Sequence, residues 1–241
     1  MKIKILGNGG AINDGLAYNS FIIDDSFLIE APPDVMIGIF RENIDILKIK
    51  KIYISHFHAD HYFGIPFLLL RCFMEESETD VKIIGPRGIE SRVREICITA
   101  FGTDHPMQKW VEDYVVYEEI EEEKEIVTDS GYLLKPVPLF HSPETYGFIL
   151  ESGEKKIAYL ADTYWEESLL EYIEDVNDVI VDLNGEKTDK VKVHISEDDL
   201  VTYALPNIKS GVRFYGTHLK KNKVSGNEKI NYVKPGDEIV I

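Results

Sequence analysis

Four residues with metal-binding side chains stand within six positions of the sequence, His56-Phe57-His58-Ala59-Asp60-His61. Imidazole nitrogens and carboxylate oxygens are ligands for zinc, iron and manganese. In an extended segment alternate side chains share a face, so we expect His56 and His58 to reach one metal ion together. We expect a tighter turn to aim Asp60 and His61 toward a second ion. A single histidine is more often a surface or core residue, but three histidines and an aspartate at this spacing favour a metal site.

A site with two metal ions needs more ligands, and candidates stand at the ends of predicted strands. The seven histidines of the chain are at positions 56, 58, 61, 105, 141, 194 and 218. His141, His194 and His218 lie near the end of a predicted strand or between a strand and a helix, and Asp162 follows the apolar run 157–161. Strand ends are where α/β sheets collect functional residues. These four residues are therefore candidates for the same site, and His105 has no assignment.

The positions of these residues depend on the elements before them. Alternating or continuous apolar runs predict strands at 2–6, 20–23, 26–30, 52–54, 81–84, 114–117, 133–139, 146–151, 156–161, 178–183, 212–215, 230–233 and 238–241. Apolar residues at helical spacing predict helices at 64–74, 88–100, 166–173 and 197–205, the last with Ser196 as its N-cap. We expect one hairpin around Asp24-Asp25 and a closing hairpin around Pro235-Gly236. Hairpins followed by alternating strands and helices indicate sheets with helices packed outside them.

Composition and charge exclude several classes of protein. The 241 residues are 44% hydrophobic and 29% charged, which is ordinary for a globular chain, and we expect a single domain over residues 1–241. Two cysteines are too few for a disulfide framework. No run approaches the length needed to span a bilayer, and the N-terminus lacks a secretory signal, so we expect a cytoplasmic protein. The net charge of −17 disfavours long nucleic acids as partners.

The chain resembles the metallo-β-lactamase superfamily over nearly its whole length, and the His-x-His-x-Asp-His motif is highly specific for that superfamily. The resemblance implies an α/β fold, a four-layer αββα sandwich with the metal site at one edge of the two sheets. It also implies two sets of metal ligands. His56, His58 and His141 would bind one ion. Asp60, His61 and His218 would bind the other, with Asp162 bridging both.

The intervals between these candidate ligands exclude several branches of the superfamily. The interval from His141 to Asp162 is 162 − 141 = 21 residues, too short for the substrate-gripping arm of the transfer-RNA 3′-processing ribonucleases. The interval from Asp162 to His218 is 218 − 162 = 56 residues, too few for the extra domain of the β-CASP members. The 241 − 218 = 23 residues after His218 leave no room for the C-terminal domain of glyoxalase II. Asp162 replaces the cysteine of the best-known zinc β-lactamases, and His58 the glutamate of flavo-diiron proteins.

With those branches excluded, the chain resembles the compact phosphodiesterase branch, especially the cyclic phosphodiesterase associated with carbon–phosphorus lyase. His141 is followed by Tyr146-Gly147, His194-Ile195-Ser196 opens a helix, and Thr217-His218-Leu219 resembles the Thr-His-Leu ending of that branch. The chain departs from the family at Glu30-Ala31, where an aspartate and a glycine are usual. Glu30 could accept a hydrogen bond from a ligating histidine or face solvent.

The resemblance implies a dinuclear metal-dependent hydrolase, most simply a phosphodiesterase acting on a small or cyclic phosphoester. A metal-bridging hydroxide would be the nucleophile, and His194 would donate a proton to the leaving oxygen or steady the phosphoryl group. The catalytic residues would then be His194, Asp60 and Asp162. The cofactors would be two divalent metal ions, zinc first, with manganese or iron as alternatives.

Two other functions stay open. One is hydrolysis of a carboxylic ester, lactone or thioester on the same site, because a fold does not fix a substrate. The other is a non-catalytic metal-binding protein, although none of the seven ligands is missing. The basic cluster Lys220–Lys223 could bind a substrate phosphate or be a solvated turn. The oligomeric state is also open, and a homodimer is one possibility.

Overall fold

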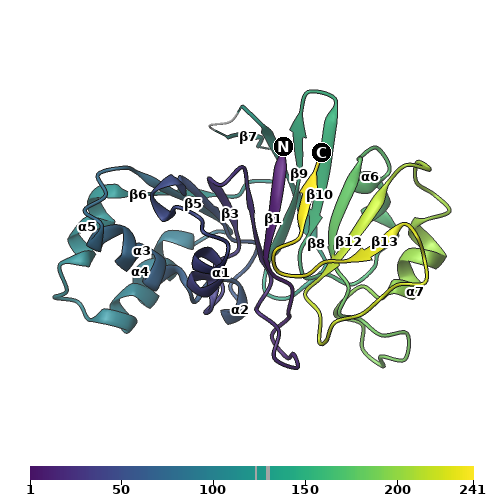
Figure 1. The fold of residues 1–241 in the computed structure, drawn as a ribbon, viewed down its shortest axis with the longest axis horizontal. Helices are drawn as coiled ribbons and strands as arrows, with labels where there is room; N and C mark the ends of the chain where they lie inside the picture. Colours follow the sequence, from purple (N-terminus) through teal and green to yellow (C-terminus); the bar gives the residue numbers. More distant parts are fainter. Residues whose placement is uncertain (123, 129–130) are drawn as a thin grey trace. The chain divides into compact units, whose positions relative to one another are not determined.

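The computed structural model describes residues 1–122, 124–128 and 131–241, which divide into two compact units (Figure 1). The first unit consists of residues 1–8, 17–120 and 234–240, and the second of residues 9–16, 121–233 and 241. Each unit contains one seven-stranded mixed sheet together with helices. Both units are thus α/β in character, as predicted. A single domain over residues 1–241 stays a prediction.

The sheet of the first unit has the strand order β14-β1-β2-β3-β4-β5-β6. The strands from β14 to β3 pair antiparallel, and those from β3 to β6 pair parallel. Asp24 and Asp25 form the β2–β3 turn with φ of 47° and 55°, so the hairpin predicted there is confirmed. The strands of this sheet are β1 (Lys2–Gly7), β2 (Ser20–Ile23), β3 (Phe27–Ile29), β4 (Lys51–Tyr53), β5 (Val81–Gly85), β6 (Val115–Glu119) and β14 (Glu238–Val240).

The helices of the first unit cover its sheet with apolar residues at helical spacing. Ile65, Leu68, Leu69 and Cys72 of one helix are buried, and they share a core cluster with sheet residues such as Ile52. The helices predicted at 64–74 and 88–100 are confirmed within a residue at each end. The helices of this unit are α1 (Val35–Arg41), the 3₁₀ turn η1 (Ile46–Lys48), α2 (Ala59–Tyr62), α3 (Ile65–Met74), α4 (Ile89–Phe101) and α5 (Met107–Tyr114).

The sheet of the second unit has the order β13-β12-β11-β10-β9-β8-β7. From β7 to β10 the strands pair antiparallel, and from β10 to β13 they pair parallel. All five residues of β11 are buried, as expected of a central parallel strand. The strands are β7 (Ile126–Val127), β8 (Leu133–Leu139), β9 (Thr145–Ser152), β10 (Lys155–Leu160), β11 (Asp178–Asp182), β12 (Arg213–Thr217) and β13 (Ile230–Tyr232).

Short helices connect the parallel strands of the second unit. Ser196 caps one of them by accepting from the backbone N–H of Asp199, so the predicted N-cap is confirmed. The Asp199 side chain accepts in return from the backbone N–H of Ser196, which completes a capping box. Leu169, Ile173, Leu200 and Ala204 turn buried sides toward the core of this unit. The helical segments are the 3₁₀ turn η2 (Glu167–Leu169), α6 (Leu170–Ile173), α7 (Glu197–Asp199) and the π-helical η3 (Leu200–Ala204).

The two sheets share one pattern, three antiparallel pairs followed by three parallel pairs. The carboxyl ends of parallel strands meet at one edge of a sheet. Candidate ligands and their neighbours follow such ends in each unit. Glu30 follows β3 and His56 follows β4, whereas Asp162 follows β10 and His218 follows β12. The parallel strands of each sheet therefore position the candidate ligands and their neighbours.

The closing hairpin predicted for residues 230–233 and 238–241 is wrong. β13 instead pairs parallel with β12, and β14 pairs antiparallel with β1. β13 and β14 each extend a seven-stranded sheet at its edge. A strand in such a sheet is more stable than one in an isolated two-stranded hairpin. Gly236 has a φ of 91°, and its N–H donates to the carbonyl of Ile5 at 2.9 Å. Its turn therefore leads the chain from one sheet to the other.

None of the helices in the described ranges 1–122, 124–128 and 131–241 is both long enough and apolar enough to cross a membrane.

Candidate metal centre

The first unit gathers the four motif residues at the carboxyl end of β4. The segment stays extended to His58, which precedes α2, and Asp60 and His61 then lie in the first turn of that helix. The Nε2 atom of His56 lies 3.0 Å from Nδ1 of His58. The rings of His56 and His61 have centroids 4.1 Å apart, and Nε2 of His61 lies 3.5 Å from Oδ2 of Asp60. The change from strand to helix thus brings all four predicted ligands of this unit together.

Two neighbours orient the histidines of the first unit. Ser55 Oγ lies 2.9 Å from Nδ1 of His56. Glu30 Oε1 lies 3.4 Å from Nδ1 of His61, and Glu30 Oε2 accepts from the backbone N–H of Ser55 at 3.2 Å. Glu30 is 0% exposed, so the solvent-facing alternative is excluded, and the carboxylate lies beside the candidate ligand His61. The sequence did not single out Ser55, which stands directly before the motif.

The second unit gathers His141, Asp162 and His218 around one carboxylate. Asp162 Oδ2 lies 3.8 Å from Nε2 of His141, and Asp162 Oδ1 lies 3.3 Å from Nε2 of His218. Asp162 and His218 are buried, with 3% and 2% of their surface exposed. The two oxygens of one carboxylate therefore face two different histidines.

His218 is held in a strained position against a glycine. Its φ is 58°, in the left-handed region that costs a non-glycine residue free energy. A Cβ at Gly10 would lie 2.9 Å from Cε1 of the His218 ring and 2.8 Å from the His218 carbonyl. Gly10 donates its N–H to Leu219 at 3.0 Å. Because Gly10 has no side chain, the backbone of the turn Gly7-Asn8-Gly9-Gly10 can approach His218 closely.

His194 belongs to the same cluster through Asp182, a residue that the sequence did not single out. Nδ1 of His194 lies 2.5 Å from Asp182 Oδ2, and the ring centroids of His194 and His218 are 5.3 Å apart. Nδ1 of His218 lies 3.5 Å from Asp182 Oδ1. Asp182 ends an apolar strand, as Asp162 follows one, and that shared placement is the signal by which it could have been found.

The Asp182–His194 pair stabilises its own charges. Burial alone lowers the pKa of His194, but the Asp182 carboxylate outweighs burial and raises that pKa above its ordinary value. Burial alone raises the pKa of Asp182, but His194 and His218 hold it below its ordinary value. A carboxylate only accepts hydrogen bonds, so Nδ1 of His194 carries the proton in this contact. The other ring nitrogen, Nε2, can therefore bind a metal ion or donate a proton.

The donor set fits divalent metal ions. Four imidazoles have Nδ1 beside an oxygen, which directs Nε2 toward a metal ion or a substrate. These pairs are His56 with Ser55, His61 with Glu30, His194 with Asp182, and His218 with Asp182. Asp162, Asp182, His194 and His218 each offer an atom, all within 4.8 Å of one another. Buried carboxylates at this density need cations nearby.

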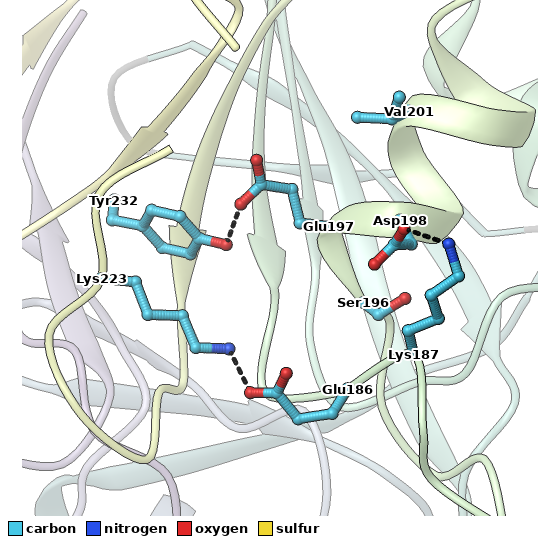
Figure 2. A pocket seen from close by; sticks show the side chains of 9 residues that line it. Glu186, Lys187, Ser196, Glu197, Asp198, Val201, Lys223 and Tyr232 are labelled. Carbon is cyan, nitrogen blue, oxygen red and sulfur yellow. Dashed lines mark hydrogen bonds and ion pairs between the residues drawn. The ribbon is translucent and has the colours of Figure 1, made fainter. Parts of the chain in front are cut away.

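A polar network in the second unit includes Ser196 and Glu197, which follow His194 in the chain. These residues line a pocket of about 300 Å³. Figure 2 shows Tyr232 pointing to Glu197 and Lys223 pointing to Glu186. The Tyr232 hydroxyl donates to Glu197 at 2.7 Å, and Lys223 donates to Glu186 at 2.9 Å. Gly185 donates its N–H to the carbonyl of Ile195, next to His194, at 2.9 Å. The network ties this segment to β13 and to the loop before it.

His105 and the Lys220–Lys223 cluster had no firm assignment from the sequence, and the structure shows contacts for His105 and Lys223. Nδ1 of His105 accepts from the backbone N–H of Met107 at 3.2 Å, and its ring packs against Phe101 and Phe73. His105 therefore helps to begin α5. Within the Lys220–Lys223 cluster, Lys223 forms the ion pair with Glu186, whereas Lys220 and Lys221 are exposed.

Known proteins resemble this chain in sequence and in fold. It is 34% identical to ribonuclease BN of Cronobacter sakazakii over 109 residues, which cover 45% of this chain and 33% of that protein. It is 32% identical to ribonuclease Z of Lactobacillus delbrueckii subsp. bulgaricus over 125 residues, 52% of this chain and 38% of that protein. The matched part of the chain thus spans 33% and 38% of the length of these two relatives.

Solved structures match almost the whole chain. The metallo-β-lactamase-fold protein YhfI of Bacillus subtilis superposes with a TM-score of 0.77, at 16% identity, over 99% of this chain and 98% of its own. A diphosphatase of the PhnP family matches with a TM-score of 0.75 at 19% identity, over 100% and 97%. Zn²⁺-bound PqqB of Methylobacterium extorquens matches with a TM-score of 0.73 at 16% identity, over 100% of both chains.

The chain therefore has the metallo-β-lactamase fold, as predicted from its motif, and the ribonuclease relatives agree with the predicted hydrolase class. Within that fold it belongs to the family described as anti-Pycsar protein Apyc1, whose model matches residues 1–238.

Proposed function

We propose that this protein is a dinuclear metal-dependent phosphodiesterase that acts on a small or cyclic phosphoester. The order of the motifs supports two ligand sets. His56, His58 and His141 would hold one ion, and Asp60, His61 and His218 would hold the other. Asp162 would contact both. Asp60 and Asp162 are thereby part of the catalytic machinery.

The arrangement of Asp162 carries this proposal. Its two oxygens face two different histidines, 3.8 Å from His141 and 3.3 Å from His218, as a bridging carboxylate requires. A carboxylate that only capped a turn would direct its oxygens to backbone N–H groups.

When bound, the two ions would polarise the phosphoryl oxygens and lower the pKa of a coordinated water toward ~7. Ligands of nitrogen and oxygen suit zinc, manganese and iron. Zinc is the first choice, supported by the Zn²⁺-bound relative of this fold.

His194 acts on the substrate through Nε2 in this proposal. The Asp182 carboxylate holds Nδ1 at 2.5 Å, which fixes the ring and the tautomer. Nε2 then donates a proton to the leaving oxygen or a hydrogen bond to the phosphoryl group. Asp182 acts through the two histidines it contacts, His194 and His218, and is a positioning residue.

The partner of the proposed enzyme is a small phosphoester. The net charge of −17 disfavours a long polyanion, since nucleic-acid affinity depends mainly on basic residues that neutralise phosphates. A homodimer and a cytoplasmic location stay predictions. Light scattering in solution tests the first, with the mass of one chain or of two as the deciding result.

The test is turnover by the purified full chain loaded with zinc, manganese or iron, with a metal-free control. The substrates are bis(p-nitrophenyl) phosphate, cyclic phosphodiesters with five- and six-membered rings, a lactone, a thioester and a short single-stranded RNA. We expect metal-dependent hydrolysis of the small phosphodiesters and a large loss of that activity in His194→Ala.

Three results would count against the proposal. No phosphodiester turnover above the metal-free control contradicts it outright. Lactone or thioester turnover that exceeds phosphodiester turnover and survives His194→Ala favours the carboxylic ester alternative. RNA cleavage faster than that of every small phosphodiester contradicts the proposed substrate size.

A further inference from the structure

Two glycines of the second unit pack against the histidines that contact Asp182. A Cβ atom added at Gly185 would lie 2.4 Å from the carbonyl oxygen of His194, and one added at Gly10 would lie 2.8 Å from the carbonyl oxygen of His218. Neither glycine has a φ in the left-handed region, so the backbone conformation does not require glycine. Glycine is required at both positions because there is no space for a side chain.

The two contacts share one geometry. Gly185 donates its N–H to the carbonyl of Ile195 at 2.9 Å, and Gly10 donates its N–H to the carbonyl of Leu219 at 3.0 Å. In each case the acceptor is the residue directly after the histidine. An isolated parallel bridge accompanies each contact. The backbone of each histidine is therefore fixed next to a glycine.

Asp182 lies between the two imidazoles. Its Oδ2 is 2.5 Å from Nδ1 of His194, and its Oδ1 is 3.5 Å from Nδ1 of His218. The carboxylate is itself held, because it accepts from the backbone N–H of Asn184 at 3.0 Å and from that of Thr163 at 3.4 Å. A carboxylate fixed in this way does not follow a histidine whose backbone moves. The contacts of both rings with Asp182 thus depend on the two glycines.

The size of each clash indicates how far the histidine would move. Ordinary contact begins at 3.4 Å, so Gly185→Ala requires a shift of 3.4 − 2.4 = 1.0 Å and Gly10→Ala one of 3.4 − 2.8 = 0.6 Å. The larger shift would take the contact between His194 and Asp182 from 2.5 Å to beyond hydrogen-bond length. In enzymes a misplacement of ~1 Å costs up to about 10²-fold in rate.

We infer that Gly10 and Gly185 are positioning residues of the metal centre. Gly185 places His194, and Gly10 places His218, against the shared carboxylate of Asp182. The inference rests on the proposed function, because it takes His218 to bind a metal ion and His194 to act on the substrate. Gly185 then sets the rate of the chemical step, and Gly10 sets the affinity for the ion that His218 holds. A general loss of stability would not separate these two effects.

Gly185→Ala is tested first in the metal-loaded full chain with bis(p-nitrophenyl) phosphate. We expect kcat to fall about tenfold to a hundredfold, KM to change less than about threefold, and the metal content to equal that of wild type. Long-range ¹H–¹⁵N NMR of the metal-free chain, at one alkaline pH, then shows which nitrogen of His194 carries the proton. We expect Nδ1–H in wild type and a mixture of tautomers in Gly185→Ala.

Gly10→Ala is tested by competition for the metal with a chelator. We expect the affinity for the more weakly bound ion to fall about tenfold to a hundredfold, with kcat at saturating metal within about threefold of wild type. With Co²⁺ in place of zinc, the visible absorption spectrum should also change, because it reports the geometry of the ligands.

Three other glycines of the second unit provide matched controls. No atom lies within 4 Å of a Cβ added at Gly211 or Gly226, so Gly211→Ala and Gly226→Ala should change none of these measurements. Gly147→Ala controls for a backbone clash as such, because its Cβ would lie 2.1 Å from the carbonyl oxygen of Tyr159. This variant should lose stability, but its folded fraction should keep the kcat and the metal affinity of wild type.

Three results overturn the inference. One is a folded Gly185→Ala that keeps its kcat and the Nδ1–H tautomer, and another is a Gly10→Ala that binds both ions as tightly as wild type. The third is an equal loss of kcat in Gly147→Ala and Gly185→Ala. If Gly185→Ala does not fold, Gly10→Ala decides, since its clash is smaller. If wild type turns over no phosphodiester, the proposed function fails, and the tautomer and the metal affinity alone decide the inference.

Discussion

Asp182 is the residue on which the orientation of His194 depends. Asp182→Asn would keep the size of the side chain but remove the charge 2.5 Å from His194 Nδ1. An amide can donate to that nitrogen, which would turn the ring to the wrong tautomer. We expect kcat to fall at least about 10²-fold while KM changes little, measured with bis(p-nitrophenyl) phosphate. Asp182 also lies 3.5 Å from Nδ1 of His218, so the rate is compared at saturating metal, where the loss of kcat reports on His194.

Asp178→Asn is the matched control, because Asp178 is a buried aspartate at the opposite end of the same strand, β11. Its carboxylate accepts from Arg213 Nε at 2.7 Å and faces no candidate ligand among the described residues. This variant should lose stability but keep kcat. Equal losses of kcat in the two variants would show that Asp182 supports only the strand.

Among the elements, α3 and α4 carry the two cysteines on their buried faces. Burial raises the pKa of Cys72 to about 11 and that of Cys97 to about 12. The thiolate is the reactive form, so a raised pKa lowers reactivity at pH 8, where about one Cys72 thiol in a thousand is ionised. We expect slow reaction with a thiol reagent at pH 8 in folded protein, acceleration as pH rises toward 11, and rapid reaction of both thiols in denaturant. Rapid labelling of the folded protein at pH 8 would contradict this burial.

The segment that carries His194 depends on contacts with β13. The Tyr232 hydroxyl donates to Glu197 at 2.7 Å, and Ser225 donates to the other oxygen of Glu197 at 2.6 Å (Figure 2 shows the Tyr232 contact). Tyr232→Phe should therefore cost about 1 kcal/mol, a fall in Tm of roughly 2–4 °C. Thermal unfolding measures the shift. Tyr203→Phe, on an exposed ring, should leave Tm unchanged; an equal shift in both variants would argue against the network.

The candidate ligands could be selected from the sequence because their residue types and spacing are rare together. Three histidines and an aspartate within His56–His61 point to metal chemistry without any knowledge of the fold. Asp182 could not be predicted in the same way. An aspartate at a strand end is common, and the role of this one depends on His194, which a loop returns to it from twelve positions away.

Elements whose stability comes from tertiary packing were missed or misassigned. α1 has seven residues and α5 has eight, and helices of that length are not stable alone. Buried residues such as Val35 and Trp110 hold them in the core of the first unit. The pairing of β13 and β14 likewise depends on which sheet edge each strand meets. The pattern of residues around Pro235-Gly236 does not encode that choice.

At the scale of the whole molecule, two units with one strand pattern each contribute candidate metal ligands. His56, His58, Asp60 and His61 belong to the first unit, and His141, Asp162 and His218 belong to the second. The proposed enzyme therefore draws each ligand set from residues far apart in the sequence. Metal content should consequently depend on folding, since a preformed site does not exist in an unfolded chain.

The central claim is that two metal ions act together, and Asp162→Ala tests it most directly. Metal content by mass spectrometry and turnover of bis(p-nitrophenyl) phosphate are measured on the same folded sample, beside wild type. We expect about two ions per chain in wild type, about one in the variant, and a loss of at least ~10²-fold in rate. A folded Asp162→Ala protein with the metal content of wild type and near-normal turnover would contradict both the bridging carboxylate and the dinuclear mechanism.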